Sequence, residues 1–220
     1  MSTLPDLSEL AADRARALAL TPVSRETAAL LDRFVELLFA TQSHTNLIGP
    51  ATVGAIWTRH IADSLQLIDL VPAAQTWLDI GSGGGFPGLV LACALAGRSG
   101  AVVHLVESQG KKAAFLRQTV DALALPAAVH HRRVEDGAFD VVPDAVAARA
   151  VAPLPRLLEY VAPFVESGAK ALLPKGQDVE AELTEAAKYW KIEAELAPSR
   201  TNPASRILVV RALRRRHGTK

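Results

Sequence analysis

The residues best suited to chemistry lie in one glycine-rich segment, residues 79–88, with the sequence DIGSGGGFPG. Glycine tolerates positive φ angles and lets a ligand come close to the backbone, so Gly81, Gly83 and Gly85 suit a ligand-binding turn. An apolar run typical of a strand precedes the segment, and one typical of a helix follows it. In open α/β sheets, a ligand held by such a turn lies over the carboxyl end of the strand.

Two kinds of ligand are compatible with this loop. The spacing Gly83-x-Gly85-x-x-Gly88 matches the fingerprint of dinucleotide-binding proteins, which is a weak signal by itself. We expect the Asp79 carboxylate to face the ligand pocket, where it disfavours a pyrophosphate and favours a cationic aminoacyl sulfonium. Pro87 also removes a backbone N–H from the turn that would hold phosphate. The pattern D-x-G-x-G-x-G at a strand end resembles the first motif of class I methyltransferases, which use S-adenosyl-L-methionine.

Two more acidic residues follow strand candidates. Glu107 ends the second strand, and a carboxylate there can accept hydrogen bonds from both hydroxyls of a ribose. This feature does not discriminate between the ligands, because NAD enzymes use the same device. Val134 and Glu135 follow the third strand, where a backbone N–H and a side-chain acceptor can contact an adenine edge. An ordinary loop acid explains Glu135 equally well.

These residues require a scaffold of alternating strands and helices. Before residue 74 the apolar spacing predicts helices at 6–20 and 24–41, with Ser24 as a cap, and a third helix capped by Thr52. After it, helices are predicted at 89–97, 111–125, 155–165 and 178–190. Strands are predicted at 76–80, 101–107, 127–133, 144–151, 169–175, 191–197 and 205–213.

This alternation predicts an α/β fold with a mostly parallel seven-stranded sheet and helices on both faces. The last two strands are joined by a connection too short for a crossover helix, so they should pair antiparallel. We divide the chain into an N-terminal helical extension (1–73), a core (74–213) and a basic tail (214–220), within one compact domain.

Composition excludes several classes of protein. The single cysteine, Cys93, lies in an apolar helix, so an internal disulfide and a cysteine-rich metal site are impossible. No cluster of residues has metal-ligand spacing, and no apolar stretch approaches the roughly 20 residues that span a membrane. The N-terminus has no signal-peptide pattern. We expect a cytoplasmic protein without a metal, and a monomer by default.

Charge is unevenly distributed although the formal net charge is only +1. Residues 191–220 contain eight Lys or Arg and two Glu, a net charge of +6. A basic segment of this kind is either a nucleic-acid contact or a solvated tail.

The sequence also resembles a specific family, RsmG (also called GidB), the bacterial 16S rRNA guanine-N7 methyltransferases. The resemblance runs from about residue 44 to residue 211. The F-P-G ending of the glycine loop and the segment RHIADS (59–64) are its most specific parts. Further matching segments are NLI (46–48), GKK (110–112), FLRQ (115–118), RVE (133–135), RAVA (149–152), PKG (174–176) and RILVV (206–210).

The resemblance implies a class I, Rossmann-like methyltransferase fold, S-adenosyl-L-methionine as cofactor and the small ribosomal subunit as partner. The cofactor contacts expected from the loop and from the resemblance are Asp79, Gly81, Gly83, Gly85, Phe86, Glu107, Ser108, Gln109, Val134, Glu135 and Arg149.

The sequence lacks motifs that other methylation targets require, and guanine N7 requires none of them. Enzymes that methylate exocyclic amines usually have an Asn/Asp-Pro-Pro-aromatic motif after the fourth strand, and here the stretch is Ala-Arg-Ala-Val (148–151). N7 carries an in-plane lone pair and no proton, so its attack needs no general base. Arg149 or Lys175 could donate a hydrogen bond to the guanine O6. An ion pair of Arg149 with Glu107 or Glu135 is the structural alternative.

Contact with RNA is expected from basic residues outside the loop. His60 could line the RNA entrance, although a lone histidine on a helix is more often structural. The expected RNA contacts are Arg59, His60, Arg132, Arg133, Lys175, Arg200 and Arg206, with His130, His131 and the tail beside them.

Other functions remain open on the sequence alone. They are a methyltransferase acting on a small molecule or protein, a nucleic-acid-binding module without catalysis, and a nicotinamide-dependent oxidoreductase.

Overall fold

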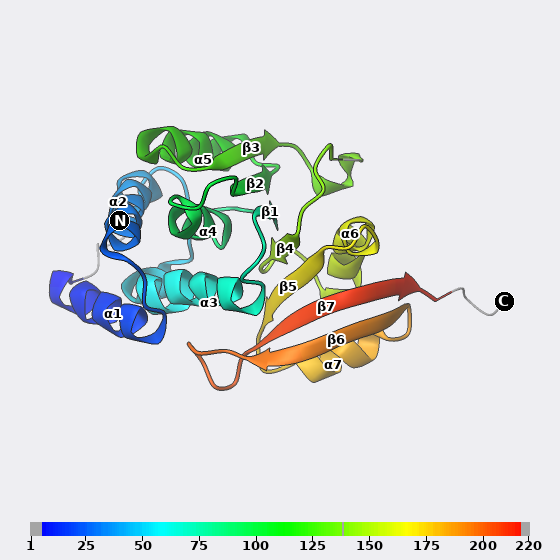
Figure 1. Ribbon diagram of the computed structural model, residues 1–220. Helices are drawn as coiled ribbons and strands as arrows, with labels where there is room; N and C mark the ends of the chain where they lie inside the picture. The colour runs from blue at the N-terminus through cyan, green and yellow to red at the C-terminus, as the bar shows by residue number, and fades with distance from the viewer. Residues whose placement is uncertain (1–5, 138, 217–220) are drawn as a thin grey trace.

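The computed structural model describes residues 6–137 and 139–216. Its centre is a seven-stranded sheet in the order β3-β2-β1-β4-β5-β7-β6 (Figure 1). Strands β1 to β5 are parallel, and β7 is antiparallel to both of its neighbours, β5 and β6. The strands are β1 (Thr76–Ile80), β2 (Val102–Glu107), β3 (Ala127–His131), β4 (Ala145–Ala148), β5 (Lys170–Lys175), β6 (Trp190–Pro198) and β7 (Arg206–Arg215). The predicted sheet and its antiparallel last strand are confirmed.

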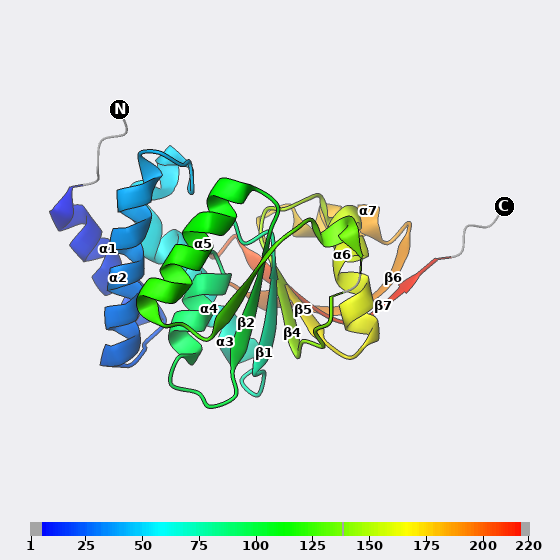
Figure 2. The same ribbon diagram turned by 90° about the horizontal axis from the view of Figure 1, so that it is seen from above.

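Helices cover both faces of the sheet (Figure 2). One apolar core joins the N-terminal helices, α4 and α5 to one face, and a second core joins α6 and α7 to the other. The central strands β1 and β4 are buried along almost their whole length, and β4 is entirely apolar, as parallel strands in such sheets commonly are. The helices are α1 (Leu7–Leu20), α2 (Arg25–Gln42), α3 (Asp63–Leu70), α4 (Gly88–Leu95), α5 (Gly110–Leu123), α6 (Leu154–Glu166) and α7 (Val179–Ala186).

The third N-terminal helix differs from the prediction. It is assembled from a 3-10 turn, η1 (Pro50–Ala55), a π-helical segment, η2 (Trp57–Ala62), and α3. Thr52 does not cap it, because its hydroxyl donates to the carbonyl of Gly49 and lies 2.9 Å from Nε2 of His60. Instead the buried Asp13 carboxylate of α1 accepts from the backbone N–H groups of Trp57 and Thr58. The cap therefore comes from a residue far away in the sequence.

The predicted cap of α2 is confirmed, whereas the predicted end of the last strand is two residues too early. The Ser24 hydroxyl accepts from the backbone of Thr27 and caps α2. Strand β7 continues to Arg215, so Arg214 and Arg215 of the predicted tail lie in the sheet. Residues 217–220 of that tail lie outside the described residues.

The glycine loop between β1 and α4 leaves no room for side chains at several positions. Gly81, Gly83 and Gly85 all have positive φ, as predicted. A Cβ on Gly84 would lie 2.8 Å from the carbonyl oxygen of Leu47, which shows that the loop packs directly against the chain between α2 and η1. A Cβ on Gly88 would lie 2.5 Å from the Asp79 carboxylate.

This crowding predicts the effect of Gly88→Ala. The added methyl group overlaps the Asp79 carboxylate and the Leu105 side chain, which should cost about 1–3 kcal/mol of unfolding free energy and lower the melting temperature by several degrees. Gly97→Ala is the matched control, because nothing lies within 4 Å of its Cβ and its φ is not positive. Equal melting temperatures for the two variants would contradict the close packing described here.

Candidate functional site

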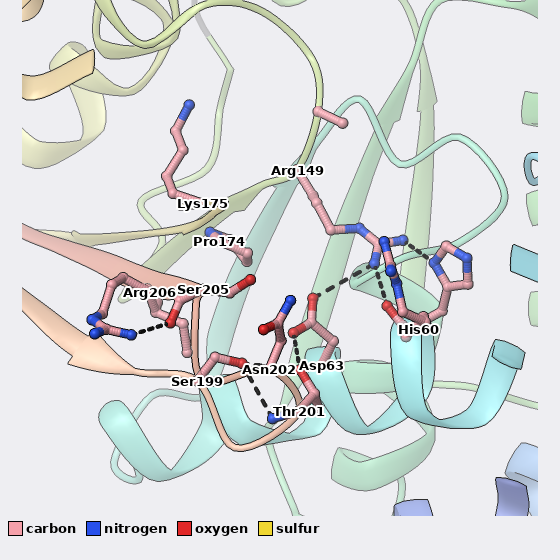
Figure 3. Close-up of a pocket in the computed structure, with 14 residues that line it drawn as sticks. His60, Asp63, Arg149, Pro174, Lys175, Ser199, Thr201, Asn202, Ser205 and Arg206 are labelled. Atoms are coloured by element: carbon pink, nitrogen blue, oxygen red, sulfur yellow. Dashed lines mark hydrogen bonds and ion pairs between the residues drawn. The ribbon is translucent and has the colours of Figure 1, made fainter. Parts of the chain in front are cut away.

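Two cavities open at the carboxyl ends of the parallel strands, on either side of the segment after β4. One, the glycine-loop pocket, has a volume of about 430 Å³ and is lined by Ile80, Gly81, Val106, Ser108, Arg132, Arg133, Val134, Glu135, Val151, Ala152, Pro153, Arg156 and Tyr160. The other, the Arg149 pocket, has a volume of about 350 Å³ (Figure 3). It is lined by Arg59, His60, Asp63, Arg149, Ala150, Pro174, Lys175, Gly176, Ser199, Thr201, Asn202, Ser205, Arg206 and Ile207.

Predicted cofactor residues that follow three different strands line the glycine-loop pocket. Gly81, Ser108, Val134 and Glu135 all line it. Glu135 accepts hydrogen bonds from the Tyr160 hydroxyl at 2.7 Å and from Arg156 at 3.3 Å, and the Tyr160 bond is the main reason its pKa is lowered. Sequence reasoning missed these two partners, since both come from α6 and only the fold brings them to the pocket.

Glu107 fixes the shape of the glycine loop. One carboxylate oxygen accepts from the Gly83 backbone at 2.8 Å, and the other accepts from the Gln109 backbone at 2.7 Å. A carboxylate has about four acceptor positions, so two are not used by these bonds, although Glu107 is only 5% exposed and lines neither pocket. Gln109 itself is the residue that precedes α5.

Asp79 differs from the expectation that its carboxylate faces a ligand pocket. The residue is 1% exposed, and one of its oxygens accepts from the Gly88 backbone at the start of α4. It lines neither of the two pockets. Burial raises the pKa of this carboxyl to about 7. Its second oxygen, Oδ1, is buried without a hydrogen-bond partner among the described residues, so an acceptor remains available beneath the loop.

Arg149 is held between the N-terminal helices and the sheet. Its guanidinium donates to the carbonyl of Arg59 at 3.1 Å and to Nδ1 of His60 at 2.6 Å. The Asp63 carboxylate lies 3.7 Å away, and the guanidinium stacks 5.5 Å from the centre of the Phe86 ring. The alternative that Arg149 pairs with Glu107 or Glu135 is wrong, because its ionic partner is Asp63.

His60 acts as a neutral acceptor in this arrangement. Because an arginine can only donate, Nδ1 of His60 must accept, which places the proton on Nε2, facing the Thr52 hydroxyl. Burial lowers the pKa of His60 to about 3, with Arg149 as a second cause. The imidazole also packs 4.8 Å from the Phe86 ring. His60 thus positions Arg149 and lines the Arg149 pocket, while its contact with RNA stays a prediction.

Asp63 links this group to the loop between β6 and β7. It accepts from the Thr201 hydroxyl at 2.9 Å and from the Gln66 amide at 2.9 Å, while burial raises its pKa. Gln66 in turn accepts from the backbone of Arg200. Asp63 stands in the RHIADS segment, which the sequence had singled out, whereas no sequence signal pointed to Thr201.

Phe86 is 5% exposed and lines neither pocket. Its ring packs 5.3 Å from Phe34 of α2 and lies beneath Arg149. In this structure it joins the glycine loop to the helical extension.

The predicted basic residues divide between several places. Arg59, Lys175 and Arg206 line the Arg149 pocket, although Lys175 is only 10% exposed and bonds to Glu182 at 2.7 Å. Arg132 and Arg133 line the glycine-loop pocket instead. Arg200 lies outside both pockets and pairs with Asp69 at 2.7 Å.

Over residues 6–137 and 139–216, no helix is long and apolar enough to cross a membrane. The same residues contain no group of three or more His, Cys, Asp or Glu side chains arranged to hold a metal ion.

Comparison with known proteins identifies the family. The family model described as rRNA small subunit methyltransferase G matches residues 27–206. The chain belongs to this family. It is 55% identical to ribosomal RNA small subunit methyltransferase G of a Bradyrhizobium species over 95% of both chains. The corresponding protein of Nitrobacter hamburgensis is 56% identical over 94% of this chain and 80% of its own length.

A solved structure supports the fold independently. An O-methyltransferase from Bacillus cereus, in complex with SAH, aligns with a TM-score of 0.58 at 16% identity, covering 91% of this chain and 99% of its own. At that identity the likeness concerns the fold, and the predicted class I methyltransferase architecture is confirmed.

The role of His60 leads to a direct test by NMR. The imidazole should remain neutral, with its proton on Nε2, down to about pH 4, because burial and Arg149 both oppose a second proton. Nitrogen chemical shifts of the ring report tautomer and charge, and the signal lost in His60→Asn identifies the residue. A titration near the ordinary value of 6.5 would show that the ring is not enclosed as described.

Proposed function

We propose that this protein transfers a methyl group from S-adenosyl-L-methionine to N7 of a guanine in 16S ribosomal RNA. The observation that carries this proposal is the pair of adjacent pockets in a chain of the rRNA small subunit methyltransferase G family. Residues 149–153 separate them, so that a ligand in the glycine-loop pocket and a base in the Arg149 pocket would be close neighbours.

The residues of the glycine loop fit S-adenosyl-L-methionine. When bound, this cofactor supplies an electrophilic methyl group on a positively charged sulfur. Glu107 has two acceptor positions that its bonds to Gly83 and Gln109 do not use, and these suit ribose hydroxyls. Gly81 lies closely against Val151, since a Cβ there would lie 2.6 Å from a valine methyl group. Asp79 supports the loop from beneath, through its bond to the Gly88 backbone, and does not line the pocket.

Arg149 is the residue best placed to act on the base. Its guanidinium has five N–H donors, and the bonds to Arg59 and His60 use two of them. The remaining N–H groups can donate to Asp63 and to a ligand in the pocket. A donor aimed at the guanine O6 would orient the base so that the in-plane lone pair of N7 points at the methyl group. Guanine N7 has no proton to lose, so the pocket needs no general base.

The surroundings of the pocket suit an RNA substrate more than a small molecule. Arg59 and Arg206 line it and can contact phosphates, whereas Lys175 is largely buried and bonds to Glu182. Base-flipping energetics favour an unpaired or loop guanine as the target. A protein that acts on the small ribosomal subunit works in the cytoplasm, and we propose that it acts there as a monomer.

Cofactor choice can be tested by thermal stability. S-adenosylhomocysteine at 100 times its dissociation constant should stabilise the native state by about 2.7 kcal/mol, whereas NAD at the same concentration should not. The measurement is the melting temperature with each ligand, with the Gly81→Val variant as a control that blocks the loop. Stabilisation by NAD alone would favour the oxidoreductase alternative.

The role of Arg149 can be tested by turnover. Small ribosomal subunits that lack their base methylations are incubated with methyl-labelled S-adenosyl-L-methionine, and label in the RNA is counted. Arg149→Ala should lower kcat on the order of 10²-fold at saturating cofactor, because a base that is no longer oriented loses its alignment with the methyl group. Arg149→Lys, which keeps the charge but loses the planar fork, should recover part of the rate.

Two outcomes would change this interpretation. If Arg149→Ala weakens only the binding of S-adenosylhomocysteine and leaves kcat intact, Arg149 has no role at O6. If the unaltered protein binds the cofactor but labels no RNA, a small molecule or a protein is the acceptor.

A further inference from the structure

The β6–β7 hairpin carries a second basic surface at the end that lies away from the Arg149 pocket. The loop 199–205 at one end contributes to that pocket, while Lys191 and Arg214 to Arg216 lie at the other, beside the C-terminus (Figure 1). Nine residue steps of β7 separate Arg206 from Arg215, which corresponds to roughly 30 Å. The two ends are therefore too far apart to belong to one site.

Two cations at this end stand directly opposite each other. Lys191 of β6 pairs in register with Arg214 of β7, so both side chains project from the same face of the hairpin. Like charges in this position destabilise a sheet. Both residues are exposed, and neither has an ion pair within the part of the chain that the structure describes. Repulsion between the two cations lowers the stability of the hairpin unless an anion lies between or beside them.

Neighbouring arginines on the same hairpin are neutralised. Arg211 pairs with Glu195 at 2.6 Å, and Arg215 pairs with Glu159 at 3.4 Å. A lysine on an edge strand can serve to prevent pairing with another sheet, which would explain Lys191. The same role is open to Arg214, because β7 pairs with β5 only from Arg206 to Val210. Protection of an edge does not, however, require two like charges directly opposite each other.

This basic surface at the end of the hairpin contains a cavity, and an exposed aromatic residue lies next to it in the chain. Lys191, Arg214, Arg215, Arg216 and the single carboxylate of Glu166 line a cavity of about 610 Å³. Arg216 donates to the Trp190 carbonyl and is not neutralised there. Tyr189, whose carbonyl accepts from the backbone of Arg216, is 52% exposed. Tyr189 does not line the cavity but adjoins it in the chain, and cations near an exposed aromatic ring are typical of surfaces that bind RNA strands.

We propose that Lys191, Arg214 and Arg216 bind the phosphate backbone of ribosomal RNA at a point roughly 30 Å from the methylated base. This inference rests on the proposed function and extends it. The first contact surrounds the target base, and the second attaches the far end of the hairpin to another part of the same subunit. Such a contact carries no sequence information but fixes the orientation of the enzyme on its substrate.

The test compares two double variants with the same change in charge. Lys191→Gln with Arg214→Gln removes the unpaired cations, whereas the control, Lys188→Gln with Arg211→Gln, removes a lysine and an arginine that each have a carboxylate partner. Binding to small ribosomal subunits is measured at several KCl concentrations. The first variant should lower the slope of log K against log[KCl] by about 1.5, because two phosphate contacts are lost. Its KM for the subunit should rise several-fold with kcat unchanged.

The outcomes separate this inference from the proposed function. Equal slopes and KM values for the two double variants, with normal methylation of RNA, would overturn the second contact and leave the function standing. A reduced slope in a protein that methylates no RNA would leave the second contact standing and overturn the function. If the first variant loses binding only to vesicles containing phosphatidylglycerol, the surface serves a membrane, and the inference is wrong.

Discussion

The burial of one guanidinium determines much of this structure. The Arg149 side chain is 20% exposed at the end of β4, and burying an unpaired charge costs several kcal/mol. Asp63, His60 and the Arg59 carbonyl compensate for that cost, and all three belong to the helical segment before the sheet begins. The N-terminal helices are therefore part of the site, since they supply nearly all the groups that hold its central cation.

The same constraint connects the two pockets. Arg149 lines one pocket, and Val151, two residues later, lines the other and packs against Gly81. Between them Ala150 has a φ of 54°, a left-handed conformation that costs about 1–2 kcal/mol for a residue with a Cβ. The anchoring of Arg149 on one side and the contact of Val151 on the other keep this strained turn in place. In the proposed function, this turn would set the distance between the cofactor and the base.

Much of the fold was predictable because it depends on local patterns. Apolar runs of strand length, helical spacing and the capping Ser24 are read from neighbouring residues, and the loop glycines have the predicted positive φ. The errors involve contacts between distant segments. Thr52 is not a cap because Asp13 of α1 takes that role, and Arg149 pairs with Asp63 because η2 and β4 meet in space. Asp79 turns inward because a helix N-terminus lies above it, which no spacing rule reports.

The central claim is that cofactor and base occupy different pockets separated by residues 149–153. A crystal structure with S-adenosylhomocysteine tests it most directly. The account predicts density for the ligand in the glycine-loop pocket beside Gly81 and Glu135, with Arg149 still bound to His60 and its own pocket open. A ligand seated in the Arg149 pocket, in place of the proposed guanine, would contradict the account.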